Sequence, residues 1–524
     1  MDHQQDSVFE ATNEAIDTPA YQRTALEAAK ERIDAQVADR MPFWLEMTDA
    51  EGFRAMELEA AGLGRELADA ITRDVLEQVI SDPGLQAVTT AAAMKGSEMA
   101  MRRDGIKEVP VRLLGGSEIR VRALYIRPEQ QSRPGPRRKP GKRGKSGVGL
   151  YPVLAALGIC EKVTPALGAE VARQVAGSDS FRPALEALKS RGIDLGYKTA
   201  LRIANAFGQR AVEQRNAWVE AIHQARAHRG SVLAGKRVVV GIDGGRTRVR
   251  VPNSRGRRRK SGHRGFETPW REPKLFVIYV VDAQGEVEAK FRPVYDGTMA
   301  DADAVYRILT AYLKSLGAEQ AAQLIVVADG AEWIWNRVAP LVEDLGLPAD
   351  RAIQVVDWYH AVEYLGEVAT LGQFGSPQKR ARWLKQAKDL LWAGDIEGLL
   401  AEMGELAKSP GASEVLDRVG YFQRNASRMQ YRTQRAREVP IGSGAVESAI
   451  RRIINLRIKG NSKFWLEENA EGMILMRGYL KAGRFDDLVT WSNAAAVPWW
   501  NNLAWLSPLG LDLRHERSAT GLAA

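Results

Sequence analysis

The chain has 524 residues, of which 27% are charged and 45% hydrophobic, and these values exclude a fully disordered, collagen-like or coiled-coil protein. Its single cysteine, Cys160, excludes an intramolecular disulfide framework and a cysteine-cluster zinc site, and it favours a reducing cytoplasm. The net charge of +9 is uneven, because residues 1–100 carry 20 acidic and 8 basic side chains while the remainder carries 45 acidic and 66 basic ones. A basic excess of this size attracts polyanions, so nucleic acid is the expected partner.

The first hundred residues are predicted to be helical. Small and apolar residues recur at helical spacing over Ala25–Val37 and Leu67–Ile80, and Pro83-Gly84 breaks the second run. The polar, acidic N-terminus does not resemble a signal peptide. Since its negative charge would be repelled by DNA, we expect this region to serve assembly or control rather than catalysis.

A β-hairpin and a basic arm are predicted next. Over Val109–Ile126 the apolar period changes to two around a Gly115-Gly116 turn. Seven of the fourteen residues of Ser132–Lys145 are basic and none is acidic, which indicates a basic linker or a DNA-contacting arm. The segment is not a phosphate-binding P-loop, because lysine stands where that motif needs its first glycine. The arm residues expected to contact DNA are Arg137, Arg138, Lys139, Lys142 and Arg143.

Residues 150 to about 230 return to a helical pattern. An amphipathic helix over Pro183–Arg191, a glycine-bounded turn over Gly192–Gly196 and a second helix over Tyr197–Phe207 fit a helix-turn-helix. We expect Lys198 and Arg202 of the second helix to be exposed and to read the DNA. An ordinary helical hairpin remains the alternative.

From Lys236 onward the pattern changes to apolar strands. Three strands, a helix over Ala300–Leu316 and two further strands separated by a helix give the order βββαβαβ, which is that of a ribonuclease-H-like core. The longest apolar run, Leu275–Val281, is far short of the roughly 20 residues that cross a bilayer, and no membrane partner is expected. Residues 358 to about 435 are predicted to be helical, and Gly442-Ser443-Gly444 to open a helix ending near Leu456. The predicted strands are Arg237–Ile242, Lys274–Asp282, Ala289–Tyr295, Leu324–Ala328 and Ala352–Val356.

Three carboxylates of this region are candidates for catalysis. Asp243 and Asp329 each follow a hydrophobic strand and precede a glycine, while Glu447 lies in the first turn of a helix, whose dipole favours its ionised form. If the first and fourth strands are neighbours, the two aspartates can share a metal that Glu447 also reaches. Two Mg²⁺ ions, for which Mn²⁺ is expected to substitute, would then promote phosphodiester chemistry. The alternative is that Asp-Gly after a strand is only a common turn.

The pair Asp357 and His360 is expected to play a supporting role. Asp357 closes the fifth strand, and at a spacing of three the two side chains lie on one face of the following helix, close enough to hydrogen-bond each other. We interpret them as outer residues that fix the strand end beside the metal. The alternative is an Asp N-cap followed by a surface histidine.

The remaining candidates are basic residues that would contact the DNA backbone. A run beginning directly after Asp243 contributes several of them, and the segment after Glu447 contributes more. They are Arg246, Arg248, Arg257, Arg258, Arg259 and Lys260 in the first run, and Arg451, Arg457 and Lys459 in the second.

Six motifs stand together in a recognisable order: GIDGGRTRVR, WREPK, VVADGAEWIW, VVDWYHAVEYL, YFQRNASRMQY and IGSGAVESAIRRIINLRIKG. Residues 150 to about 485 thereby resemble DDE transposases of bacterial insertion sequences, and most of all the ISKra/ISLre type. The resemblance implies a ribonuclease-H-like core with a helical insertion, Mg²⁺-dependent cleavage at the ends of a mobile element, and strand transfer. It places the DDE triad on Asp243, Asp329 and Glu447. It also implies double-stranded DNA partners (terminal inverted repeats and target DNA) and a homo-oligomer on DNA in a bacterial cytoplasm.

One departure from that family and two other functions remain open. Members often carry a cysteine-containing segment where this chain has its basic arm. The Asp243-Gly244-Gly245-Arg246-Thr247 sequence also resembles the phosphate loop of actin-like sugar kinases and ATPases, although no later Gly-Gly pair provides an adenosine loop. A catalytically silent, transposase-derived DNA-binding protein is the third possibility.

The sequence therefore predicts a multidomain α+β protein with a ribonuclease-H-like catalytic core, a helical insertion and preceding helix-turn-helix-like DNA-binding segments. The expected segments are an acidic helical region (1–105), a hairpin and basic arm (106–148), a DNA-binding domain (149–232), the first part of the core (233–370), a helical insertion (371–440), a core helix carrying the third acid (441–485) and a Trp-rich tail (486–524).

Overall fold

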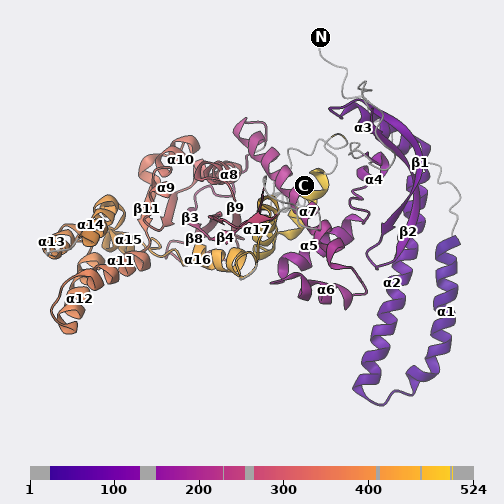
Figure 1. Cartoon of the computed structure of the whole chain (residues 1–524), viewed down its shortest axis with the longest axis horizontal. Coiled ribbons are helices and arrows are strands. Elements are labelled where there is room, and N and C mark those ends of the chain that lie inside the picture. The colour runs from indigo at the N-terminus through magenta and orange to yellow at the C-terminus, as the bar shows by residue number, and fades with distance from the viewer. Residues whose placement is uncertain are drawn as a thin grey trace, which may run out of the picture. The chain divides into compact units, whose positions relative to one another are not determined.

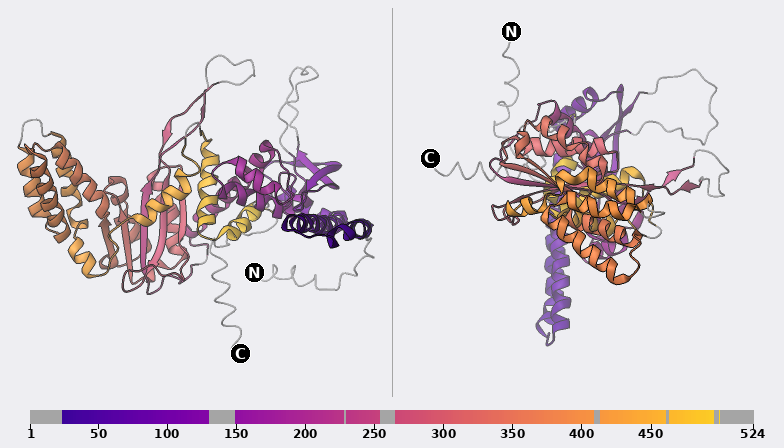
Figure 2. Two further views of the ribbon diagram at one scale, coloured as in Figure 1. Left: turned by 90° about the horizontal axis from the view of Figure 1, so that it is seen from below. Right: turned by 90° about the vertical axis from the view of Figure 1, so that its left-hand side faces the viewer.

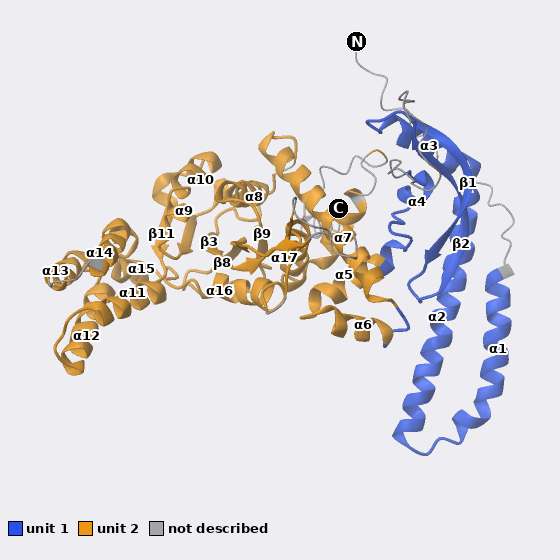
Figure 3. Cartoon of the chain, viewed as in Figure 1, with its two compact units in different colours: residues 1–167, 190–194 blue, residues 168–189, 195–524 orange. Residues whose placement is uncertain are grey.

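The computed structural model describes residues 24–129, 149–227, 229–253, 265–408, 413–460, 463–495 and 499. The chain forms two compact units, residues 1–167 with 190–194 (unit 1) and residues 168–189 with 195–524 (unit 2), which Figure 3 distinguishes by colour. Helices and strands are mixed, as expected for a multidomain α+β protein. Within the described ranges, no helix is both long enough and apolar enough to cross a membrane.

Unit 1 combines long helices with a two-stranded sheet. Helices α1 (Thr24–Leu45) and α2 (Ala50–Ser81) run side by side in Figure 1, and α3 (Pro83–Lys95) follows. The break predicted at Pro83 is confirmed: the carboxylate of Asp82 accepts the N–H of Leu85 and caps α3, whose first residue is proline. Strands β1 (Met101–Arg112) and β2 (Glu118–Pro128) form the predicted hairpin, which begins eight residues earlier than expected.

The hairpin and the helices of unit 1 share one hydrophobic core. Leu76 and Ile80 of α2 pack with Val111 and Val121 of the strands and with Leu154 of α4 (Pro152–Ala156). The boundary expected at residue 105 falls inside β1. The basic arm, Ser132–Lys145, lies outside the described residues, so Arg137, Arg138, Lys139, Lys142 and Arg143 have no structural account.

The helices that precede the large sheet include the predicted pair. Helix α5 spans Pro165–Gly177, α6 spans Phe181–Lys189 and α7 spans Tyr197–His223. The predicted end of the last helix at Phe207 is wrong by sixteen residues. Its buried face continues through Trp218 and Ile222 and packs against α8, α17 and α18, so tertiary contacts carry the helix further.

The large sheet of unit 2 has five strands in the order β11-β10-β3-β8-β9. Strands β3, β10 and β11 are parallel, whereas β8 is antiparallel to β3 and to β9. The bounds are Arg237–Gly244 for β3, Lys274–Val281 for β8, Val294–Thr298 for β9, Gln323–Ala328 for β10 and Ala352–Val356 for β11. Because parallel strands end at the same edge, the residues that follow β3, β10 and β11 gather there.

The third predicted strand is displaced. It was expected over Ala289–Tyr295, but β9 is Val294–Thr298. The preceding residues form a turn in which the N–H of Phe291 bonds the carbonyl of Glu288, and Pro293 has no N–H for a strand ladder. The strand therefore begins only after the proline.

Short strands extend the sheet edge beyond Asp243. Strand β4 (Thr247–Arg248) pairs with β7 (Trp270–Arg271), and β5 (Val251–Pro252) pairs with β6 (Phe266–Glu267). Figure 2 shows this narrow ribbon projecting from the sheet. Residues 254–264, with Arg257, Arg258, Arg259 and Lys260, lie outside the described part of the chain.

Helices cover both faces of the sheet. A side chain at Gly241 would meet Val446 of α16, whereas Phe276, the partner of the next residue Ile242, packs on Tyr312 of α8. Since successive strand residues face opposite sides, α16 and α8 cover opposite faces. On these sides the bounds are Ala302–Ser315 for α8, Glu332–Trp335 for α9, Val338–Leu345 for α10, Gly444–Ala449 for α16, continued by a π-helix over Ile450–Asn455, Glu467–Lys481 for α17 and Phe485–Ala495 for α18.

The predicted helical stretch after β11 gathers at one end of the sheet (orange in Figure 2). Trp491 of α18 is buried against Trp218 and Tyr479, so it is a core anchor, whereas Trp500 and Trp505 lie outside the described residues. The helices after β11 are α11 (Trp358–Leu371), α12 (Pro377–Ala393), α13 (Ile396–Ala407), α14 (Ser413–Asn425) and α15 (Tyr431–Ala436), and short 3₁₀ turns cover Ala318–Gln320, Ala349–Arg351 and Ala426–Arg428.

Candidate active site at the ends of three parallel strands

Asp243 and Asp329 lie at the same edge of the sheet. Ile242 of β3 pairs with Ala328, the last residue of β10, and each aspartate is the next residue of the chain. The prediction of a shared metal required the first and fourth strands to be neighbours, and β3 and β10 are neighbours. Gly330 is needed for close approach, because a Cβ there would lie 1.9 Å from the ring of Tyr421.

The surroundings of both carboxylates disfavour their ionised forms. Burial, followed by the charge of Asp329, raises the pKa of Asp243 to about 6, and burial raises the pKa of Asp329. The Oδ1 atom of Asp243 accepts the N–H of Gly244 at 2.6 Å, and the Oδ1 atom of Asp329 accepts the N–H of Ala331 at 3.0 Å. Among the described residues, neither carboxylate has a Lys or Arg within ion-pair distance. Two crowded carboxylates with oxygens to spare are the ligands that a divalent cation prefers.

Asp357 connects the third parallel strand to the helix of Glu447. Its fully buried carboxylate accepts the backbone N–H of His360 at 2.7 Å and the backbone N–H of Ser443. The hydroxyl of Ser443 in turn donates to Oε1 of Glu447 at 2.8 Å. Asp357 thus caps α11, as the alternative interpretation held, and the expected hydrogen bond to the imidazole is replaced by one to the His360 backbone.

His360 lies among the acidic groups. Its Nε2 is 3.8 Å from Oε1 of Glu447, and its charge lowers the pKa of both Asp243 and Asp329. The charge of Glu447 contributes to the raised pKa of Asp243. Ligand atoms of Asp357, His360 and Glu447 lie within 4.8 Å of one another. The five predicted residues therefore form one cluster, although this tightest group differs from the predicted triad.

The helical insertion adds residues that the sequence did not suggest. A cavity of about 510 Å³ adjoins Asp329 and is lined by Tyr421 and Arg424 of α14. Arg424 forms an ion pair with Glu332 at 3.1 Å, and Tyr421 stacks on Tyr364 with ring centroids 4.1 Å apart. Tyr421 and Arg424 both belong to the YFQRNASRMQY motif, so this motif was the one sequence feature that could have indicated them.

The predicted DNA-contacting residues have mixed positions. Arg246 and Arg248 are exposed, with their guanidinium groups 5.3 and 4.8 Å from the ring centre of Trp270. Lys198, Arg202, Arg451 and Lys459 are also exposed. Arg457 differs from these residues, because it is only 3% exposed and its guanidinium is not presented to a duplex on the surface.

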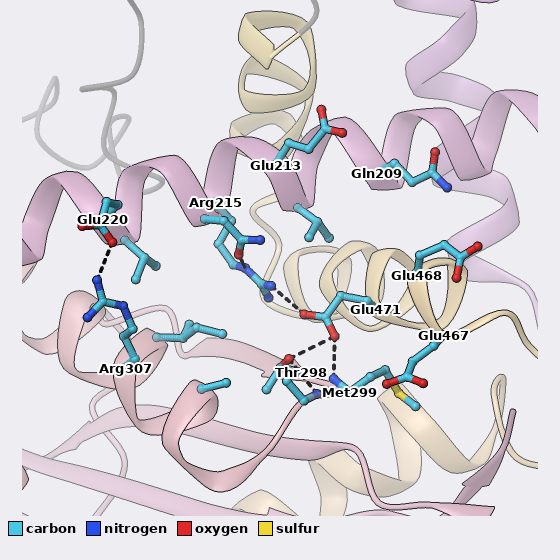
Figure 4. A pocket seen from close by; sticks show the side chains of 16 residues that line it. Gln209, Glu213, Arg215, Glu220, Thr298, Met299, Arg307, Glu467, Glu468 and Glu471 are labelled. Atoms are coloured by element: carbon cyan, nitrogen blue, oxygen red, sulfur yellow. Dashed lines mark hydrogen bonds and ion pairs between the residues drawn. The ribbon is translucent and has the colours of Figure 1, made fainter. Parts of the chain in front are cut away.

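A second cavity, of about 660 Å³, is acidic and internally paired (Figure 4). The carboxylate of Glu471 accepts hydrogen bonds from Arg215 at 2.6 Å and from Thr298 at 3.1 Å. Arg215 also bonds the buried Asp296 at 3.2 Å, so its charge is fully compensated. Burial opposes that charge, but the two carboxylates raise the pKa of Arg215 above its usual value. We interpret this cavity as the surroundings of a structural ion-pair network.

No family model matches the chain, and no curated protein matches it. A solved structure, the Drosophila P element transposase strand transfer complex, is similar over 68% of this chain and 86% of that chain. The sequence identity is 11% and the TM-score is 0.22, which is too low to establish a common fold.

Proposed function

We propose that the chain is a DDE-type DNA transposase built on a ribonuclease-H-like core, which binds the ends of its own mobile element and catalyses cleavage and strand transfer. The observation that carries the proposal is the parallel pair β3–β10, which ends in two half-buried carboxylates that no Lys or Arg of the described ranges pairs with, and which has Glu447 close enough to affect the pKa of Asp243. The strand order supports the ribonuclease-H-like assignment, because the first three strands form an antiparallel meander and the last two lie parallel to the first.

The chain's own residues would divide the work. Asp243, Asp329 and Glu447 would hold two Mg²⁺ ions, which when bound would activate the attacking oxygen and stabilise the leaving one. Asp357 would position Glu447 through Ser443, since its carboxylate fixes the start of that segment. Arg246 and Arg248 would hold phosphates of the bound strand next to the carboxylates.

The test uses the DNA that flanks the reading frame as substrate. Alanine at Asp243, Asp329 or Glu447 should abolish Mg²⁺-dependent cleavage and strand transfer while leaving duplex binding nearly unchanged, because losing a metal ligand affects chemistry more than phosphate contacts. Glu397→Gln removes an exposed acid of α13 that lies outside the cluster and is the matched control, which should cleave normally. Normal cleavage by the Glu447→Ala protein would refute the triad. Binding of duplex only in the presence of a nucleotide would favour the actin-like alternative.

A further inference from the structure

A third cavity of unit 2, of about 680 Å³, is built from residues outside the carboxylate cluster. Its walls come from the starts of α6 and α7, the ribbon after β3, Arg457 and residues 463–466. This volume is within the range of small-molecule sites. The lining combines cations with aromatic rings, among them Phe181, Tyr197, Arg250, Arg457, Lys463 and Trp465.

Arg457 is a buried cation with unused donors. Its Nη1 atom reaches the carbonyl of Asp179 at 3.4 Å, but its Nε and Nη2 atoms have no hydrogen-bond partner. Burial, followed by the charge of Arg477, lowers its pKa to about 10. Arg215 in the acidic cavity is equally buried but bonds two carboxylates. The guanidinium of Arg457 lies 4.9 and 5.2 Å from the ring centres of Phe181 and Trp465, but it has no carboxylate partner like those of Arg215. Because unpaired buried donors are costly, an anion beside Arg457 would be stabilised.

The other charged groups leave the cavity positive. The Nζ atom of Lys463 donates to the carbonyls of Asp179 and Arg457, at 3.2 and 3.4 Å, and makes no carboxylate ion pair within the described residues, although the nearby charge of Asp179 acts on both cations. Glu186 is an acid of the lining and is paired with Arg182 at 3.1 Å. An anion would therefore meet a buried guanidinium and a half-buried ammonium.

Aromatic rings provide a surface for a planar group. Phe181 and Tyr197 meet edge to face with centroids 5.1 Å apart, and Phe464 lines the cavity with 37% of its surface exposed. Trp465 is held in place because its Nε1 donates to the carbonyl of Ile458 at 3.1 Å. Rings beside phosphate-binding cations are the features that recognise a nucleotide.

The cavity wall is bonded to the segment that follows Asp243. The N–H of Arg250 donates to the carbonyl of Trp465 at 2.6 Å, and the N–H of Trp465 donates to the carbonyl of Arg248 at 3.3 Å. A strand held along Arg246, Arg248 and Arg250 would thus pass the mouth of the cavity. We propose that this cavity binds one unpaired nucleotide of the bound DNA, with its phosphate on Arg457 and Lys463 and its base against the aromatic rings. The DNA source of the nucleotide rests on the proposed function.

The test measures binding without cleavage. The full-length protein, in EDTA, is titrated into a short fluorescein-labelled duplex and into the same duplex carrying one unpaired adenine. The bulged duplex should bind roughly 10-fold more tightly, as expected for one stacked base. Arg457→Gln and Lys463→Gln should reduce this preference to about 2-fold, while Arg307→Gln, which removes a cation paired with Glu220, should retain it. Lys463 is not fully buried, so its variant tests the site even if Arg457→Gln unfolds.

The outcomes separate this inference from the proposed function. Full preference for the bulged duplex in both cavity variants would overturn the cavity assignment. A second outcome would be that the wild type binds the two duplexes equally and that deoxyadenosine monophosphate, but not inorganic phosphate, displaces the labelled duplex. This outcome would show that the cavity binds a free nucleotide and would contradict the inference that the nucleotide belongs to DNA. Failure to bind either duplex would refute the proposed function itself. The Asp243→Ala protein should keep the preference for the bulge, since the assay requires no metal.

Discussion

Asp243 and Asp329 are placed where their charges cost stability. The raised pKa of Asp243, about 6, means that the unfolded chain ionises this carboxyl first as pH rises. The contribution of this carboxyl to the free energy of unfolding is fully present below the ordinary pKa of an aspartate, near 3.9, and is lost as pH rises through about 6. At neutral pH the metal-free protein therefore carries a destabilising pair, which a bound cation would neutralise.

We expect Asp243→Asn to stabilise the metal-free protein at neutral pH by about 1–2 kcal/mol, because the amide keeps the acceptor for Gly244 but carries no charge. The gain should shrink as pH falls below about 6 and disappear below about pH 3, where the carboxyl is protonated in both states. Adding Mg²⁺ should stabilise the wild type and leave the variant unchanged. Urea unfolding in EDTA and in Mg²⁺ measures both effects. A variant less stable than the wild type at neutral pH would contradict the crowding of the two carboxylates.

Ser443 and Asp357 allow the positioning of Glu447 to be tested. Ser443→Ala removes the hydrogen bond to Oε1 of Glu447, and Asp357→Asn replaces an acceptor of a backbone N–H by an amide. Each should slow single-turnover cleavage by about 10–100-fold without changing DNA affinity, the scale for losing a partner of a metal ligand. Titration with Mn²⁺ provides the check: loss of one ion in Asp357→Asn would make Asp357 a ligand itself.

Sequence pattern was sufficient to place Asp243 and Asp329, because each is marked locally by an apolar strand before it and a glycine after it. It could not provide the bond from Asp357 to Ser443, which joins residues 86 positions apart. The burial of Arg457 was likewise hidden, since an arginine in a basic run has the sequence signature of a surface cation.

At the scale of elements, local signals fixed some boundaries and tertiary contacts fixed the others. Strand β11 has the predicted bounds, and α8 begins where Asp301 caps it. The length of α7 depends on partners far along the chain in α17 and α18, so a window of sequence did not reveal it. A tertiary contact of α2 was also not evident from the sequence, because its acidic composition gave no sign that one of its aspartates has a structural role.

That aspartate is Asp69, which secures the hairpin turn to α2. Its carboxylate accepts the N–H groups of Gly115 and Ser117 at 2.8 and 3.0 Å, and a Cβ at Gly115 would lie 2.6 Å from it. Asp69→Ala should destabilise unit 1 by about 2 kcal/mol, because it leaves two amides without their charged acceptor. Hydrogen exchange at Gly115–Ser117 should accelerate more than exchange in β3. Substituting the exposed Glu57 of the same helix is the control, and equal exchange in both proteins would contradict the role of Asp69.

At the scale of the whole molecule, charge separates the acidic first hundred residues from the basic remainder. If DNA follows the ribbon after Asp243, then Arg246, Arg248 and Arg250 should carry much of the salt dependence of binding. Their simultaneous replacement by glutamine should reduce the slope of log K against log[salt] by up to about 0.9 for each phosphate that is no longer neutralised. Fluorescence anisotropy over a range of KCl concentrations measures this slope. Lys379, Arg380 and Arg382 of α12 are also exposed, and their replacement removes the same charge from the insertion. A general electrostatic attraction would be weakened equally by either set of replacements. A larger decrease of the salt slope in the ribbon variant would therefore place the duplex beside the carboxylates. An equal decrease in the two variants would contradict that placement.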